Sequence, residues 1–202
     1  DGQSNLNSPQ VVEVLTYLKE LYDAGVVAPG VLSKAEQVKV EEFSTGNIGF
    51  MVGSMPYIGV LSNRAPDLNF TVGPVPKKDL FGYRVHGWEL GVASKSEHKD
   101  VAWAFISKLL EPEVNARFAN AVNQLPGNTA ASGDWIQENP NLDTAATILK
   151  EHRSVEELRM TPSAVSSWQL LTEEIQAMLS GDQSAEETAQ RAHERWEELF
   201  QD

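Results

Sequence analysis

Residues 86–131 read HGWELGVASKSEHKDVAWAFISKLLEPEVNARFANAVNQLPGNTAA, and the order of elements within them predicts how the chain is organised. Apolar residues first alternate with small or polar ones, which predicts a strand at residues 88–93. Apolar side chains then recur at helical spacing over residues 101–109. Pro112 ends this helix and begins a second one, because proline lacks the N–H group that a helix interior needs but suits a first turn. The second helix ends before Leu125-Pro126-Gly127.

The residues before this stretch predict helices and short strands. Asn7-Ser8-Pro9 begins a helix that Gly25 ends, since glycine takes the left-handed C-cap conformation at little cost. A shorter acidic helix is predicted from about Lys34 to Ser44. We then expect a strand at residues 48–52, a turn at Gly53-Ser54-Met55-Pro56 that opens a helical turn to Leu61, and a strand at residues 70–76 that leads into a hairpin.

The C-terminal third is predicted to be helical. Short helices are expected around Trp135 and over residues 142–149. Thr161-Pro162-Ser163 begins a long helix whose apolar stripe is predicted to be Val165, Trp168, Leu171, Ile175 and Leu179. Ser184 and Glu187 have the spacing of a capping box for a last helix, which is predicted to run to about Phe200.

Composition excludes several classes of function. The chain has 202 residues, enough for a sizeable core, and a net charge of −13. This charge argues against binding to nucleic acid or to anionic lipid, because both need basic surfaces. The sequence has no cysteine, so thiol chemistry is excluded. No apolar run is long enough to span a membrane, and the N-terminal DGQSNLNSPQ lacks the features of a signal peptide.

The sequence contains little that indicates catalysis. None of its four histidines has the spacing of a metal site. Ser96 and Lys99 match a Ser-x-x-Lys pattern, but a cap for the following helix explains the serine better. Most carboxylates are interpreted as solvated helix surface. We expect no catalytic residue, no metal and no cofactor.

Several segments resemble one family. The strand-helix order with Ala102-Trp103-Ala104-Phe105-Ile106 followed by Pro112-Glu113-Val114, the segment FSTGNIGFMVGS before Pro56, and the Gly73-Pro74-Val75-Pro76 stretch resemble the extracellular solute-binding proteins of bacterial sugar ABC transporters, which are maltose-binding-protein-like. The resemblance implies an α/β, periplasmic-binding-protein-like fold of two lobes. This chain would be its helix-rich C-terminal portion, with most of the first lobe missing.

The resemblance also implies how the chain divides between lobes. Residues 1–85 would form the first segment of the second lobe, and residues 132–202 would supply its C-terminal helices. Residues 86–131 would cross the hinge, near residues 86–89, and return from the first lobe. The helix at residues 101–109 would then present an apolar stripe of Ala102, Phe105, Ile106 and Leu109 without the sheet that it should cover. We expect this stripe to be covered by residues outside this chain, by a second copy or by rearrangement.

A function follows from the resemblance as an expectation. The protein would capture a sugar or oligosaccharide between its lobes and deliver it to ABC transporter permease subunits, with no reaction catalysed. It would be periplasmic or extracellular, with a lipoprotein anchor as one option at an N-terminus missing here. The full-length protein is expected to be monomeric, and the fragment is open to self-association. The ligand is not specified, and a sugar phosphate or polyol stays open.

Candidate ligand-binding residues combine aromatic faces, which suit the C–H side of a sugar ring, with polar groups for hydroxyls. For Trp88 the residues alone leave strand core and ligand contact equally open, and for Trp168 helical periodicity favours core packing. The resemblance favours contact with the sugar for Trp168. Trp103, Trp135 and Trp196 are interpreted as structural. By position in the family pattern, the other candidates are Tyr57, Ser54, Glu89 and Asn123.

Two other classes of function stay open. A carbohydrate-active hydrolase would need an acid and a base at a fixed separation, and the sequence identifies no such pair. A helical interaction module without a small ligand would have no cleft lined by Trp88 and Trp168.

Overall fold

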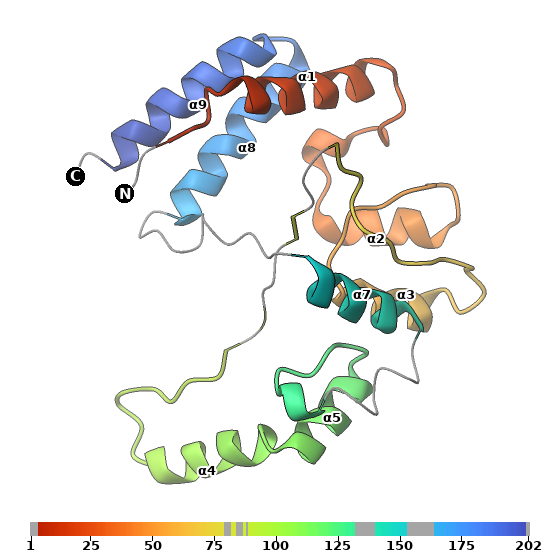
Figure 1. Ribbon diagram of the computed structural model, residues 1–202, viewed down its shortest axis with the longest axis vertical. Coiled ribbons are helices and arrows are strands. Elements are labelled where there is room, and N and C mark those ends of the chain that lie inside the picture. The colour runs from red at the N-terminus through yellow and green to blue at the C-terminus, as the bar shows by residue number, and fades with distance from the viewer. Residues whose placement is uncertain are drawn as a thin grey trace. The chain divides into compact units, whose positions relative to one another are not determined.

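The computed structural model describes residues 4–78, 82–83, 87, 89–131, 140–152 and 164–200. Helices dominate these residues (Figure 1). In chain order they are α1 (Pro9–Asp23), η1 (Val31–Ser33), α2 (Glu36–Ser44), α3 (Pro56–Arg64), α4 (Lys99–Leu109), α5 (Pro112–Ala121), η2 (Thr129–Ala131), α7 (Pro140–Glu151), α8 (Ala164–Ser180) and α9 (Ala185–Leu199). Each helix predicted within the described residues is present.

Packing divides the chain into two compact units. One, here called the terminal unit, comprises Asp1–Lys34 and Glu156–Asp202, and the other, the central unit, is Ala35–Val155. These units are defined by contacts within this chain. The lobe boundaries expected after residues 85 and 131, and the hinge near residues 86–89, stay predictions.

The terminal unit is built from three helices. α8 and α9 form an antiparallel pair, and α1 packs against both of them (Figure 1). Its core contains Leu15 of α1, Met178 of α8 and Ala189 of α9, with Val11, Val12, Ile175 and Leu179 packed around them. Alanines on α9 leave little side-chain volume between helices, so the three axes can approach closely. The unit therefore joins the first helix of the chain to the last two.

The turn between α8 and α9 is fixed by local hydrogen bonds. Gly181 has φ +94° and ends α8, where the Asp182 N–H donates to the Ala177 carbonyl at 3.0 Å. At the start of α9, the Glu187 N–H donates to Ser184 Oγ at 3.1 Å and the Ser184 N–H donates to Glu187 Oε2 at 2.7 Å. The predicted capping box is thus confirmed.

The buried face of α8 differs from the predicted apolar stripe. Val165 is 82% exposed and Trp168 is 37% exposed, whereas the buried residues are Ser167, Leu170, Glu174 and Met178. These four recur at the spacing of one helix face. The predicted stripe is right in part, because Ile175 and Leu179 are partly buried and pack on the core. It is wrong at Val165, and the most buried positions lie one residue away, where Ser167 and Glu174 are polar.

The central unit has a smaller core. Ile58 of α3 and Leu142 of α7 are buried against each other, and Met55, Phe70, Val72 and Leu125 pack around them. A second contact region joins α4, α5 and η2. There the buried Asn115 accepts a hydrogen bond from the Asn128 N–H at 3.0 Å, so the loop after α5 is tied to its own helix.

The strands predicted at residues 48–52 and 70–76, and in the described part of residues 88–93, are not formed. Within the residues that the structure describes, the only β-type assignment is an isolated bridge at Tyr83. A strand satisfies its N–H and C=O groups only through a neighbouring strand, and the described residues supply none here. Phe50 is consequently 96% exposed and Val52 is 72% exposed.

The apolar stripe predicted on α4 is exposed only in part, because Ala102 and Leu109 are partly buried. Phe105 is 65% exposed, although its neighbour Ile106 is buried. Trp103 is 55% exposed, so its interpretation as a core residue is wrong in this chain. Trp196 on α9 is buried and its ring stacks on Phe200 with centroids 5.0 Å apart, which confirms its structural role. Trp135 lies outside the described residues.

Candidate functional site

Two of the candidate ligand-binding residues lie at the start of α3. Ser54 is in the turn before the helix, and Tyr57 is its second residue, after Pro56 at the first position. The Tyr57 N–H donates to the Ser54 carbonyl at 3.0 Å, so the turn is closed by the backbone. Both side chains are partly exposed. Ser54 lies before the helix, so the backbone bond of the turn, and not helical spacing, is what connects these two residues.

Gly53 lies directly against the Tyr57 ring. A Cβ atom built on Gly53 would be 2.7 Å from Tyr57 Cδ2 and 3.5 Å from the Met51 methyl carbon. The aromatic ring therefore occupies the space that a side chain at residue 53 would need. The sequence analysis identified the turn but did not predict this contact, because it depends on the side-chain rotamer of Tyr57.

Asn123 occupies the end of α5 in the left-handed conformation, with φ +51°. The Gln124 N–H donates to the Ala119 carbonyl at 2.9 Å and the Asn123 N–H donates to the Asn120 carbonyl at 3.1 Å. These two bonds form a Schellman motif, in which asparagine is the second choice after glycine. Part of the reason for asparagine at this position is therefore helix termination.

Asn123 also contacts α3, but not on the side of Tyr57. A Cβ atom built on Gly59 would be 2.8 Å from Asn123 Cβ, so the turn after α5 packs on α3 at Gly59. Residues two positions apart point to opposite sides of a helix. The structure thus connects Ser54 and Tyr57 through one backbone turn and places Asn123 against Gly59 of α3.

The remaining candidates are Glu89, Trp88 and Trp168. Glu89 is exposed and lies outside any helix or strand. Trp88 lies outside the described residues. Trp168 is on α8 in the terminal unit, with about a third of its surface exposed, which is intermediate between a core tryptophan and a fully solvated one.

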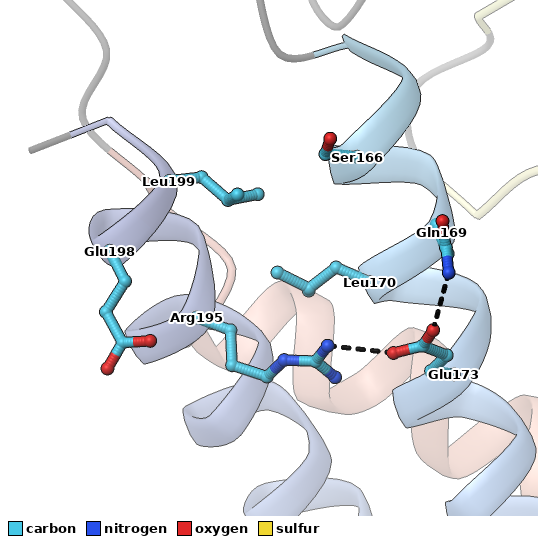
Figure 2. Close-up of a pocket in the computed structure, with 7 residues that line it drawn as sticks. All are labelled: Ser166, Gln169, Leu170, Glu173, Arg195, Glu198 and Leu199. Carbon is cyan, nitrogen blue, oxygen red and sulfur yellow. Dashed lines mark hydrogen bonds and ion pairs between the residues drawn. The ribbon is translucent and has the colours of Figure 1, made fainter. Parts of the chain in front are cut away.

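A hollow of about 340 Å³ lies between α8 and α9. Its lining is mostly polar and consists of Ser166, Gln169, Leu170, Glu173, Arg195, Glu198 and Leu199 (Figure 2). Figure 2 shows Arg195 reaching from α9 to Glu173 on α8, at 2.8 Å, while Gln169 donates to the same carboxylate at 3.0 Å. Hydrogen bonds from Arg195 and then Gln169 lower the pKa of Glu173.

Arg195 is held by a second carboxylate beneath the hollow. Glu174 is only 2% exposed and accepts hydrogen bonds from Arg195 at 2.7 Å, Gln183 at 2.9 Å and Arg191 at 3.0 Å. Burial raises the pKa of Glu174, but the bonds from Gln183, Arg195 and Arg191 together outweigh burial and hold its pKa below the usual value. Glu173 and Glu174 together neutralise the guanidinium group of Arg195. The packing of α8 on α9 therefore explains the charged groups at the hollow.

Sequence reasoning missed this network because it assigned most carboxylates to solvated surfaces. One signal was present: Glu174 has the same helical spacing as Leu170 and Met178, while Arg191 and Arg195 are four residues apart on α9. A buried acid opposite two arginines on one face is typical of an ion-pair network between helices.

The described residues contain no group of three or more histidine, cysteine, aspartate or glutamate side chains placed to hold a metal ion. In the same residues, no helix has the length and apolar character needed to cross a membrane.

The structure is similar to solved solute-binding proteins with two lobes. MalE3 of T. maritima, solved with maltose bound, matches 99% of this chain with a TM-score of 0.86 at 18% identity. The MalE domain of Bdellovibrio bacteriovorus, bound to maltotriose, matches 99% with a TM-score of 0.80 at 21% identity. This chain covers 53% and 52% of those two chains, so it corresponds to about half of the two-lobe α/β fold.

Sequence comparison agrees with the fold. A relative from Brucella abortus, which is named as a binding protein, is 26% identical to this chain over 156 residues. These residues are 76% of this chain and 38% of that protein. Residues 1–144 match the family model described as bacterial extracellular solute-binding protein. This is a family of binding proteins and not of enzymes, so the hydrolase interpretation is not supported. The chain belongs to the bacterial extracellular solute-binding protein family.

Proposed function

We propose that this chain is part of the substrate-binding component of a bacterial ABC transporter. The protein captures a sugar or an oligosaccharide in a cleft between two lobes and delivers it to the permease. Closure follows from the ligand contacting both lobes, because it then binds the closed state more tightly than the open state. Anchoring to the membrane by a lipid, and a monomeric state of the full-length protein, are part of the same proposal.

The observation that supports a sugar ligand is the exposure of Trp168. Trp196, in the same unit, is 7% exposed and stacks on Phe200, whereas Trp168 is 37% exposed. An indole in the first turns of a helix with that much surface is suited to stack on a sugar ring. The related structures named above contain maltose and maltotriose. UgpB of Mycobacterium tuberculosis contains glycerophosphocholine, so a phosphodiester of glycerol stays an alternative ligand.

The two tryptophans provide a matched pair for the test. In the full-length protein, Trp168→Ala should weaken binding of the preferred sugar about tenfold or more, with a small change in melting temperature. Trp196→Ala should destabilise the fold by about 3–5 kcal/mol, while the folded fraction binds the sugar normally. Calorimetric titration with maltose, maltotriose and glycerophosphocholine, alongside thermal unfolding, separates the two effects. Unchanged affinity after Trp168→Ala would contradict the proposal that this residue contacts the ligand.

A further inference from the structure

The turn before α3 contains a contact between Gly53 and Tyr57 that the proposed function does not explain. Gly53 is exposed, but the side of it on which a side chain would start faces the ring of Tyr57: a Cβ atom on residue 53 would be 2.7 Å from Cδ2 and 3.3 Å from Cε2 of that ring. Separations below 3.0 Å are essentially never found between real Cβ atoms and their neighbours. Any residue with a side chain at position 53 therefore forces the Tyr57 ring to move.

The backbone of Gly53 does not itself require glycine. The positive-φ glycines among the described residues are Gly25, Gly30, Gly46 and Gly181. Alanine can therefore adopt the backbone conformation of Gly53. Glycine matters at this position only because a side chain would need space that is already filled. That space is occupied by the tyrosine ring and, at the margin, by the Met51 methyl group.

The backbone of Tyr57 is held in place by the turn before α3 and by the start of the helix. Pro56 and the bond from the Tyr57 N–H to the Ser54 carbonyl set the start of α3, and the next residue, Ile58, is buried in the core of the central unit. The Cα of Tyr57 is thus anchored, so the ring orientation depends on what it rests against. The Cδ2–Cε2 side of the ring lies next to Gly53, and Tyr57 stays partly exposed.

We propose that Gly53 is a positioning residue that sets the orientation of the Tyr57 ring as an aromatic surface for the sugar. This inference rests on the proposed function, because it assumes a solute that contacts Tyr57. Gly53 does not touch the solute in this proposal; it acts only through Tyr57. Aromatic stacking depends on ring orientation, so a rotated ring changes the affinity for flat sugar faces.

Gly49 provides a matched control in the same extended segment. A Cβ atom on Gly49 meets nothing within 4 Å, and its φ is likewise not in the left-handed region. Alanine at either position reduces the freedom of the unfolded chain to a similar extent. A difference between Gly53→Ala and Gly49→Ala therefore reports the contact with Tyr57.

The experiment measures calorimetric affinities in the full-length protein for maltose, maltotriose and glycerophosphocholine, and uses whichever of these binds the wild-type protein most tightly. Gly53→Ala should raise the Kd about threefold to tenfold, the range of one aromatic contact. Its melting temperature should stay close to that of wild type, because a side-chain ring can rotate. Gly49→Ala should leave the Kd within about twofold of wild type, as expected for a position in open space.

A double-mutant cycle tests whether Gly53 acts through Tyr57. In the Tyr57→Ala background, Gly53→Ala should cause no further loss of affinity. Three results would overturn the positioning role: wild-type affinity in Gly53→Ala, an equal loss of affinity in Gly49→Ala, or an undiminished loss from Gly53→Ala when the Tyr57 ring is absent. None of them would affect the Trp168 test. If the wild-type protein binds none of the three probes, the proposed function is overturned and this inference with it.

Discussion

Replacing Glu174 with glutamine removes one negative charge from the α8–α9 network and leaves the side-chain volume almost unchanged. The Glu174 side chain is only 3% exposed and interacts with two arginines, at 2.7 Å and 3.0 Å. Breaking a fully buried ion pair costs about 3–5 kcal/mol. Here the partners are less buried, since the side chains of Arg191 and Arg195 are 61% and 39% exposed. Water can hydrate both guanidinium groups after the substitution, so we expect a loss of about 2–3 kcal/mol.

The loss should depend on pH in a defined direction. The pKa of Glu174 in the folded protein lies below its usual value of 4.5. The folded state therefore binds a proton less readily than the unfolded state, and its stabilisation is complete above the unfolded pKa. This stabilisation is lost as the pH falls through the folded pKa. The difference between wild type and Glu174→Gln should be full at pH 7 and should shrink below about pH 4.

Thermal unfolding measures both quantities. At pH 7, Glu174→Gln should lower the melting temperature by about 5–10 °C in a protein of this size. Glu173→Gln is the matched control, because Glu173 binds the same Arg195 but its side chain is 46% exposed. It should change the melting temperature little. Equal shifts for the two variants, or a shift for Glu174→Gln that is the same at pH 7 and pH 3.5, would refute the role assigned to burial.

Three further predictions concern stability and are checked by urea unfolding at pH 7. Ser184→Ala removes the capping box and should cost about 1 kcal/mol; an unaltered midpoint would show that the cap is dispensable. Leu142→Ala, at a side chain with 0% exposure, should cost about 2–5 kcal/mol, and a loss below 1 kcal/mol would mean that the α3–α7 core collapses around the cavity. Gly181→Ala should cost about 1–2 kcal/mol because its φ is +94°, whereas Gly127→Ala, with open space around it, should not destabilise.

Local signals in the sequence predicted the helices well. Pro9, Pro56 and Pro112 each begin a helix, Gly25 and Gly181 each follow one, and Ser184 caps α9. These signals depend on a residue and its near neighbours in the chain, so they can be recognised without knowing the tertiary structure.

Features that depend on distant partners could not be predicted in the same way. On α8 the apolar stripe was predicted only in part, because the buried Glu174 pairs with arginines on another helix and no scale of hydrophobicity contains that information. The segments with Phe50 and Val75 have strand composition, but pairing is a property of two strands and the described residues provide only one of each pair. The contact of Tyr57 with Gly53 depends on a rotamer. Of the candidate site, residue types and the α3 turn were predictable, and the side-chain geometry was not.

The joining of the two chain ends in the terminal unit has a consequence for biosynthesis. The Ser4 N–H donates to Glu197 Oε1 at 2.8 Å, and α1 packs on α9. At about 5–20 residues per second, a ribosome needs roughly 10–30 s to proceed from the end of α1 to the start of α9. Until α8 and α9 are synthesised, Leu15 and its apolar neighbours on α1 lack the two helices that they contact in the folded unit. The central unit is continuous in sequence and is synthesised before α8. It can therefore fold before α1 has its partner helices. The terminal unit can therefore assemble only after α8 and α9 have been synthesised, whereas the central unit consists of one continuous segment.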